Sequence, residues 1–403
     1  MTTTILIGPA DRRARAVASY LLADAAALRR RLRDRGVDVQ LVSAFDPGVV
    51  GSDTDADLRP DVVLDVPVRS RDQRADGIAS AGLLARELAA VAADGVVHAV
   101  GWRATAVAVT ARAETGVPVV AHADQLPSWP GDDRADGTVM ARLGWAALGA
   151  ADKVVVESTW ARDVAVRRGV VPDRLHVVGP ALTRLPAEAA TAPAADEPLV
   201  LSVGDPGDVG SLRPVAEAVL HHPGARLVVA GGAGLDPAAV AAVKERLREL
   251  PVVRRLGTRC RVAPEPAASL CRRADLVVDV SSTPGRGLGV LAAMFEARPL
   301  VAAAVGGADE LVVDRVTGLL VEPRDRVHTR DAVADLLADP FRLEAYGLAG
   351  RDRAQAVFDP EQLTDALVAV HERAAGRSER DADEVETVDV RDVDGASSSV
   401  VPA

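Results

Sequence analysis

The sequence is poor in aromatic residues, lysine and cysteine. Aromatic residues make up 2% of its 403 residues, and lysine occurs only at Lys153 and Lys244. The two cysteines, Cys260 and Cys271, have the spacing of neither a redox motif nor a zinc-ligand set, which argues against both kinds of site. We expect two reduced core thiols in a cytoplasmic protein. The scarcity of lysine beside abundant alanine, valine and arginine points to a bacterial genome rich in G and C.

Positive charge and long apolar stretches are also in short supply. The formal net charge is −11, which argues against non-specific binding to nucleic acid or to an anionic membrane but leaves room for a local basic pocket. No run is apolar enough to span a bilayer, and the start, MTTTILIGPADRR, lacks the basic start and long apolar stretch of a signal peptide. With 48% hydrophobic and 26% charged residues, the composition is that of a soluble globular protein.

Short valine-rich runs alternate with helical patterns along the first part of the chain. Runs of this kind are typical of parallel strands that helices cover on both faces. The pattern predicts a Rossmann-like domain over residues 1–182. Its predicted strands are 3–9, 37–43, 61–68, 95–101, 116–124 and 151–158, and its predicted helices are 12–35, 81–93, 103–114 and 137–149.

A second alternation begins after a segment without periodicity. Residues 183–198 are rich in alanine, proline and acidic residues, which predicts an interdomain linker. Runs such as EPLVLSVGD, ARLVVAGG and ADLVVDVSS then predict a second Rossmann-like domain over 199–356. We expect an amphipathic helix over 357–376 to cross back onto the first domain, and the acidic tail 377–403 to be disordered. The predicted fold class is α/β, with two Rossmann-like domains facing across a cleft.

The order and spacing of these segments resemble the retaining nucleotide-sugar glycosyltransferases of family four, group 1 type, which have the GT-B fold. The segments that carry the resemblance include GVPVVAH, ADKVVVESTWARDVAVRRGV, LVLSVG, RRADLVVDVSS, LAAMFEARPLVAAAVGGADELV and VTGLLVEPRD. The resemblance implies an acceptor-type domain over 1–182 and a nucleotide-sugar-type domain over 199–356. It further implies hexosyl transfer with a nucleotide-sugar donor as substrate and no separate cofactor.

The chain departs from this family at the positions that carry charge. After the first strand of the second domain, Asp205 stands at the family's arginine and Gly210 at its lysine. The two glutamates around the family's glycine turn become Pro284 and Ala292, and its paired glycines after the first strand become GPADRR at residues 8–13. One preorganised donor typically lowers a barrier by about 3–4 kcal/mol. These departures therefore predict a weakened donor site.

The glycine-rich turn SSTPGRGLG still runs into a short apolar helix. Its backbone N–H groups could hold an anion at the helix start, and Arg286 could make a bidentate phosphate contact. The alternative is a tight strand-to-helix turn with a solvated arginine. With two positions that the resemblance adds, the candidate donor-binding residues are Gly204, Gly285, Arg286, Gly287, Gly289 and Glu310.

The candidate catalytic residues are His122 and Asp124, which lie two positions apart on a predicted strand and therefore share a face. They could form an acid–base pair at the cleft, or His122 could be a strand-end histidine bonded to solvent or backbone. Aligned on the family, His122 stands at a threonine and Asp124 at a histidine; a register shift of two would make His122 the family histidine. His98 also matches a family histidine, although a histidine within a strand is more often structural.

Two further acidic features have both a binding and a structural interpretation. Asp205 and Asp208 could hold Mg²⁺ that bridges a diphosphate, but two carboxylates on a loop more commonly form a solvated turn. Glu296 could reach toward the cleft from one turn beyond Ala292, or it could pair with Arg298 or a neighbouring helix. We favour the structural interpretation of both features and predict no metal site.

Two functions fit these observations. In the first, the chain is a glycosyltransferase-family protein with a degenerate donor site, weak or inactive alone, that acts as a non-catalytic paralogue, with an active glycosyltransferase as partner or through self-association. In the second, it is an active divergent transferase that moves a hexose from a nucleotide sugar to a glycan, lipid or small molecule. The altered site residues favour the first, and the resemblance favours the second. A nicotinamide oxidoreductase is disfavoured because TTILIGPADRRARA lacks the glycine fingerprint.

Overall fold

The computed structural model divides the chain into two compact units. Unit 1 contains the described residues up to Gly179 and those from Glu361 onward, and unit 2 contains those from Pro180 to Pro360. Most of the predicted linker, residues 183–196, and the predicted tail, 377–403, lie outside the described residues. The structure describes residues 2–7, 25, 28–43, 61–64, 73–91, 95–124, 126–128, 138–180, 182, 197–204, 208–230, 237–263, 265 and 267–376.

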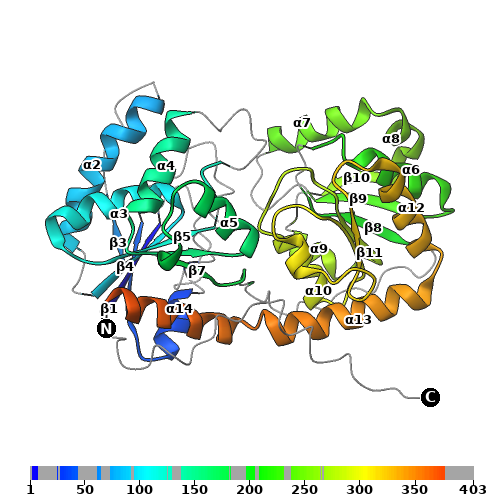
Figure 1. Ribbon diagram of the computed structural model, residues 1–403. Helices are drawn as coiled ribbons and strands as arrows, with labels where there is room; N and C mark the ends of the chain where they lie inside the picture. The colour runs from blue at the N-terminus through cyan, green and yellow to red at the C-terminus, as the bar shows by residue number, and fades with distance from the viewer. Residues whose placement is uncertain are drawn as a thin grey trace, which may run out of the picture. The chain divides into compact units, whose positions relative to one another are not determined.

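Unit 1 is built on a parallel seven-stranded sheet with the strand order β3-β2-β1-β4-β5-β6-β7 (Figure 1). Its strands are β1 (Thr2–Ile7), β2 (Asp38–Ser43), β3 (Val62–Val63), β4 (Gly95–Val100), β5 (Val119–Ala123), β6 (Lys153–Val156) and β7 (Leu175–Val177). Its helices are α2 (Gln73–Val91), α3 (Trp102–Thr115), α4 (Val139–Ala150), α5 (Thr159–Arg167), the short η3 (Pro172–Arg174) and α14 (Pro360–Ala374).

Side-chain alternation along the strands sorts unit 1 into two layers. Val97, Ala99, Ala121 and Ala123 point to one face of the sheet, where α3 packs between α2 and α4. The positions between them on β4 and β5 point to the opposite face, because successive side chains of a strand alternate. The last helix, α14, packs on that opposite face, and its buried side chains include Leu363 and Leu367, which lie four residues apart.

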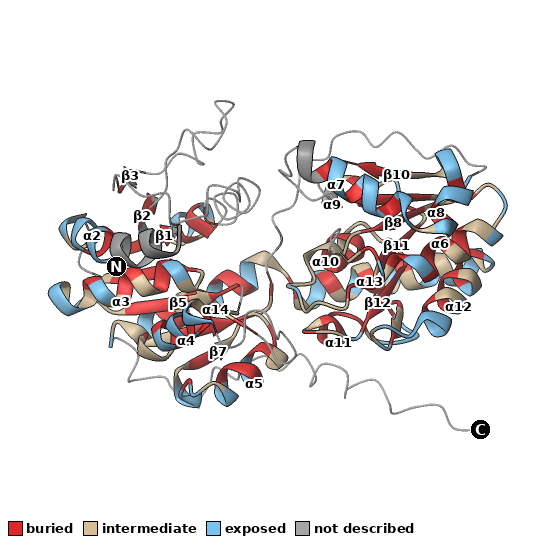
Figure 2. Ribbon diagram, turned by 90° about the horizontal axis from the view of Figure 1, so that it is seen from above, coloured by how far each residue is buried: buried red, intermediate tan, exposed pale blue. Residues whose placement is uncertain are grey.

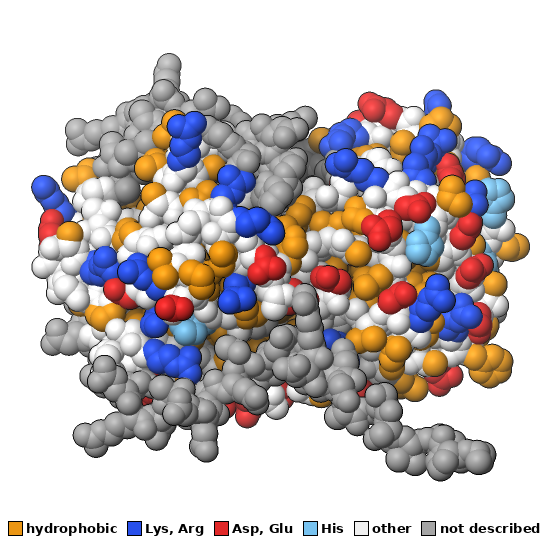
Figure 3. All heavy atoms as spheres, in the orientation of Figure 1, with side chains coloured by type: hydrophobic (Ala, Val, Ile, Leu, Met, Phe, Trp, Pro, Cys, Tyr) orange, Lys and Arg blue, Asp and Glu red, His pale blue; other side chains and the backbone are white. Residues whose placement is uncertain are grey.

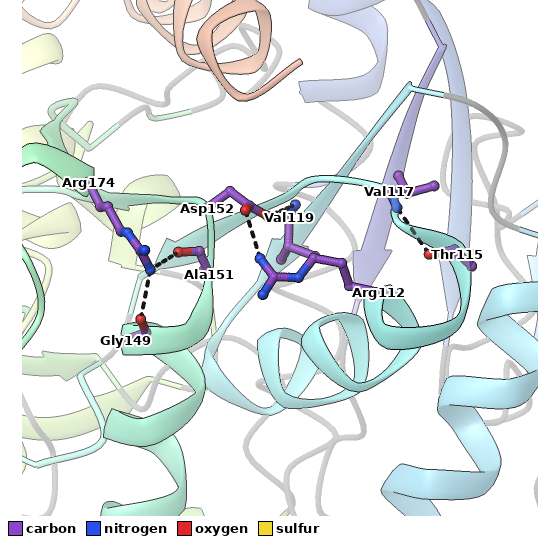
Figure 4. A network of polar contacts seen from close by, with 8 residues as sticks. All are labelled: Arg112, Thr115, Val117, Val119, Gly149, Ala151, Asp152 and Arg174. Atoms are coloured by element: carbon purple, nitrogen blue, oxygen red, sulfur yellow. Dashed lines mark hydrogen bonds and ion pairs between the residues drawn. The ribbon is translucent and has the colours of Figure 1, made fainter. Parts of the chain in front are cut away.

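A polar network holds the amino ends of β5 and β6 in unit 1 (Figure 4). Asp152 accepts hydrogen bonds from Arg112 Nη1 at 2.7 Å and from the backbone N–H of Val119 at 2.8 Å. Arg174 donates to two backbone carbonyls at the end of α4, at 3.1 and 3.2 Å. The network ties the end of α3 to the amino ends of β5 and β6 and ties Arg174 to the end of α4.

Unit 2 is built on a parallel six-stranded sheet with the strand order β10-β9-β8-β11-β12-β13. Its strands are β8 (Leu199–Ser202), β9 (Arg226–Ala230), β10 (Cys260–Ala263), β11 (Leu276–Asp279), β12 (Leu300–Ala303) and β13 (Leu319–Val321). Its helices are α6 (Leu212–His221), α7 (Pro237–Arg248), α8 (Pro251–Leu256), η4 (Gly257–Arg259), α9 (Ala267–Cys271), α10 (Leu288–Phe295), α11 (Ala308–Leu311), α12 (Arg326–Leu337) and α13 (Pro340–Val357). The predicted α/β class, with two parallel-sheet Rossmann-like units, is confirmed.

In each unit the buried residues follow the strands and the inward sides of the helices (Figure 2). Both cysteines are free thiols. Burial raises the pKa of Cys260 to about 11 and that of Cys271 to about 12, so both thiols stay protonated at neutral pH. Within the described part of the chain, no helix has the length and apolar character needed to cross a membrane.

Candidate functional site

The glycine-rich turn of unit 2 connects β11 to α10. Gly287 precedes α10 with a left-handed backbone, φ 65°, and a Cβ there would lie 2.4 Å from Cδ1 of Leu311. A Cβ on Gly289 would lie 2.6 Å from Cγ2 of Val203. Tight packing and, at Gly287, the backbone angle therefore call for glycine at both positions, with or without a ligand.

The other two candidate glycines have contrasting surroundings. A Cβ on Gly204 would lie 2.2 Å from Ser281 Oγ and 2.6 Å from Asp279 Oδ1, because the end of β8 lies directly against the end of β11. Gly285 is exposed, and its Cβ would meet no atom of the described residues within 4 Å. Arg286, beside it, is half-buried. Among the four candidate glycines, packing leaves only Gly285 unexplained.

The carboxylate of Asp208 joins two loops at the carboxyl edge of the unit 2 sheet. Its Oδ2 accepts from the backbone N–H of Ser282 at 2.9 Å and from the Ser282 hydroxyl at 2.8 Å. Asp205, its suggested metal partner, lies outside the described residues. Within the residues that are described, no group of three or more His, Cys, Asp or Glu side chains could hold a metal ion. Asp208 therefore anchors its loop to Ser282 and does not belong to a freely solvated turn.

Three of the four altered family positions carry an uncharged residue, and the fourth, Asp205, lies outside the described residues. Ala292 is buried within α10, Pro284 is half-buried in the turn and Gly210 is exposed before α6. Glu296 forms an ion pair with Arg272 at 3.0 Å, at the end of α9, which corresponds to the neighbouring-helix interpretation. The carboxylate of Glu296 is thereby committed to a structural contact.

Glu310 is buried on the short helix α11, and a residue outside the sequence-based candidates supports that helix. Arg353 of α13 donates from Nη2 to the backbone carbonyl of Glu310 and from Nε to that of Leu311, each at 3.0 Å. No sequence signal singles out Arg353, because α13 carries several arginines. Arg353 therefore fixes the backbone of α11 beside the glycine-rich turn.

Unit 1 brings three histidines together on the face that α14 covers. His98 lies on β4, His122 lies on β5, and His371 comes from α14. Nδ1 of His98 lies 2.7 Å from Nε2 of His371, and Nε2 of His98 lies 3.3 Å from Nδ1 of His122. The three imidazoles thus form a continuous chain from the buried face of α14 to the carboxyl end of β5.

Two acidic residues lie at the carboxyl ends of β5 and β6, beside this chain. Glu157 directly follows β6, and its Oε1 lies 3.4 Å from His122 Nε2. Asp124 directly follows β5 and is buried, and a Cβ on Gly101 would approach its Oδ1 to 3.4 Å. His122 and Asp124 therefore lie at one strand end, while the side-chain polar contacts of His122 run to His98 and Glu157.

Burial keeps the two inner histidines uncharged. Burial, with a smaller contribution from the neighbouring His122, lowers the pKa of His371 to about 4. Burial also lowers the pKa of His98 well below its usual range, with smaller contributions from His371 and His122. Both imidazoles are therefore neutral at pH 7, when each carries one donor and one acceptor nitrogen.

Sequence reasoning missed His371 and Glu157, although both left a signal. His371 lies four residues after Leu367, so it falls within the apolar stripe of α14. Glu157 lies two residues after the buried Val155 of β6, which places it on the same face of the sheet. In each case the sequence shows a single polar residue within a buried pattern. Its role can be inferred only when the neighbouring residues from other elements are known.

Two family models match the chain, one in each unit. The model described as Glycosyltransferase Family 4 matches residues 25–182, and the model described as Glycosyl transferases group 1 matches residues 210–339. The chain is 32% identical over 302 residues to the D-inositol 3-phosphate glycosyltransferase of Mycobacterium bovis, a match that covers 70% of this chain and 62% of that protein. It is 36% identical over 166 residues to the protein of the same name from Segniliparus rotundus, with 40% of this chain and 36% of that protein covered. The chain thus spans less than two thirds of the length of either relative.

Two solved structures illustrate the similarity of the fold. A sucrose-phosphate synthase from Thermosynechococcus elongatus aligns with a TM-score of 0.75 and 21% identity, over 94% of this chain and 100% of that one. HepE of Anabaena, solved in complex with UDP-glucose, aligns with a TM-score of 0.69 and 16% identity, over 92% of this chain and 100% of that one. These two likenesses show the fold. Together with the family models, they show that the chain belongs to the glycosyltransferases of group 1 and family 4, with the GT-B fold.

Proposed function

We propose that this chain is a glycosyltransferase-family protein with a degenerate donor site. The isolated chain binds a nucleotide sugar weakly and transfers hexose slowly or not at all. It acts as a non-catalytic paralogue, with an active glycosyltransferase or a second copy of itself as partner.

The observation that carries this proposal is the chemistry of the turn in unit 2. Pro284 and Ala292 stand where the family has two glutamates, and Gly210 stands where it has a lysine. The nearby carboxylate of Asp208 is committed to Ser282. A hydrogen bond to a charged group contributes about 1.5–3 kcal/mol, so the loss of several such contacts weakens donor binding substantially. What supports binding is the exposed backbone at Gly285 together with Arg286.

A second candidate function is active transfer by relocated residues. The group of His122, Asp124 and Glu157 at the carboxyl ends of β5 and β6 favours it, because polar side chains at that edge of a parallel sheet face the usual ligand position. Over the face seen in Figure 3, basic and acidic side chains of the described residues are interspersed. Charge distribution on that face therefore does not decide between the two functions.

Calorimetry and a turnover assay on the full chain separate the two functions. UDP-glucose is the probe, with and without Mg²⁺, and D-inositol 3-phosphate is the acceptor suggested by the names of the relatives. The degenerate-site proposal expects a Kd weaker than about 1 mM, which corresponds to about −4 kcal/mol, and little release of UDP. Robust turnover by the unmodified chain would overturn it.

Restoring one missing cation gives an independent test. Gly210 has no left-handed backbone, and a Cβ there would meet only Asp208 Oδ1, at 3.8 Å, so Gly210→Lys is sterically allowed. We expect Gly210→Lys to tighten UDP-glucose binding by about tenfold, as one charge-assisted contact implies. Gly210→Gln, with a similar reach and no charge, is the matched control and should give no such gain. Equal binding by both variants would show that the missing charge does not limit affinity.

A further inference from the structure

The three histidines of unit 1 form a hydrogen-bond chain that can run in either of two directions. A neutral imidazole has one N–H donor and one acceptor nitrogen, so fixing the proton on one ring fixes it on the next. In the first direction His371 donates to His98, which donates to His122. In the second direction His122 donates to His98, which donates to His371. The two directions place opposite groups at the two ends of the chain.

The buried end of the chain favours the first direction. Nδ1 of His371 is buried, and no described residue forms a hydrogen bond with it. In the first direction this nitrogen is a bare lone pair, whereas in the second it is a buried N–H without an acceptor. Buried N–H groups without an acceptor are the rarer and costlier case.

The outer end of the chain favours the same direction. Nε2 of His122 is buried and lies 3.4 Å from Glu157 Oε1, which is close enough for electrostatic attraction but lacks hydrogen-bond geometry. In the first direction this nitrogen carries a hydrogen and attracts the carboxylate. In the second it presents a lone pair to the carboxylate, and the two repel each other. Both ends therefore select one set of tautomers.

We propose that His371 and His98 are positioning residues that hold His122 as its Nε2–H tautomer. In this tautomer the Nε2–H of His122 is buried and faces Glu157, so His122 does not serve as a general base. The predicted acid–base pair of His122 and Asp124 is thereby replaced by a donor beside carboxylates. The residue that sets the tautomer, His371, is supplied by the last helix of the chain.

Nitrogen-15 NMR of the histidine rings tests the direction without any activity assay. The full chain has seven histidines, so the ring signals can be assigned one by one with His→Gln variants. At pH 7.5 we expect a protonated Nε2 and an unprotonated Nδ1 on His98, His122 and His371. A protonated Nδ1 on any of these three rings, as a reversed tautomer or as an imidazolium, would overturn the proposal.

A pair of amide substitutions tests which residue sets the tautomer. An amide can donate or accept, so Glu157→Gln removes the preference at the outer end while keeping the shape. His122 should stay in the Nε2–H form in this variant, because the inner end still decides; a shift to Nδ1–H would assign the control to Glu157 alone. Adding His371→Gln removes the second preference, and His98 and His122 should then populate both tautomers. A single Nε2–H form in that double variant would overturn the role of His371.

The fold and the proposed function are controlled separately in this experiment. His176 on β7 reports on unit 1 from outside the chain of three rings, so an unchanged His176 signal shows that the unit is folded. The wild-type spectrum and Glu157→Gln keep the proposal testable even if the double variant does not fold. Donor binding and turnover play no part in the readout, so an active enzyme would refute the degenerate donor site and leave the tautomers unaffected.

Discussion

The stability of unit 1 should fall in mild acid because two of its buried histidines remain neutral in the folded state. The pKa of His371 is lowered from 6.5 to about 4, and that of His98 is lowered well below its usual value. Between pH 6.5 and about 4 the unfolded chain binds a proton at His371 that the folded chain does not bind. The free energy of unfolding therefore falls as the pH falls through this window.

The magnitude follows from the width of that window. The unfolded pKa of 6.5 lies about 1.5 units above pH 5, and each unit contributes about 1.4 kcal/mol. His371 alone should therefore lower the free energy of unfolding of unit 1 by about 2 kcal/mol at pH 5. His371→Leu removes this titration. The variant should be less stable at pH 7.5, because it leaves Nδ1 of His98 without its donor. It should nevertheless lose about 2 kcal/mol less than the wild type between pH 7.5 and pH 5.

Tryptophan fluorescence during urea unfolding measures this difference. All four tryptophans lie between residues 102 and 160, within the part of the sequence assigned to unit 1. His328→Leu, at an exposed histidine on α12 of unit 2, is the matched control and should leave the pH dependence unchanged. The same loss of stability in the wild type and in His371→Leu would refute the reasoning.

Three further predictions concern packing and reactivity. Gly204→Ala should destabilise unit 2 by about 1–3 kcal/mol through overpacking, because its Cβ would lie 2.2 Å from Ser281 Oγ. In far-UV circular dichroism melts, adding Ser281→Ala should recover part of this loss of stability. A Gly204→Ala variant as stable as the wild type would contradict the close approach. Asp152→Ala should lower the free energy of unfolding of unit 1 by about 1–2 kcal/mol, measured by urea unfolding. Asp152→Asn should lower it less, because the amide oxygen still accepts the hydrogen bond from the backbone N–H of Val119. An equal loss in both variants would argue against that hydrogen bond. Cys271, with its pKa raised to about 12, should react with a disulfide reagent at pH 8 only after denaturation, and rapid labelling of the folded chain would contradict its burial.

The fold could be predicted because its physical causes are local. Strands that are buried on both faces leave continuous valine-rich runs, such as the segment that forms β6, and the chain between them must form covering helices. Glycines and prolines mark where those runs end. The class and the parallel sheets therefore follow from patterns that extend over only a few residues.

The donor-site turn shows where local patterns stop being informative. Gly204, Gly287 and Gly289 were interpreted as ligand-binding glycines, but close contacts within unit 2 already call for glycine at all three. A sequence cannot distinguish a glycine that admits a ligand from one that admits a neighbouring strand or helix, because both look the same in one dimension. The loop-anchoring role of Asp208 was equally hidden, because its partner Ser282 lies 74 residues away.

By itself, the sequence determined that His122 and Asp124 share a face at the end of a strand and that His371 falls in the apolar stripe of the last helix. It did not determine that these positions belong to one group. His98 and His371 are 273 residues apart, and only the packing of α14 on the unit 1 sheet brings their rings to 2.7 Å. That packing also removes water from both rings, keeps them neutral and makes the proton position on each depend on its neighbours. The tertiary structure decided the protonation of His98 and His371 because pKa values depend on burial and on partners that come from distant parts of the chain.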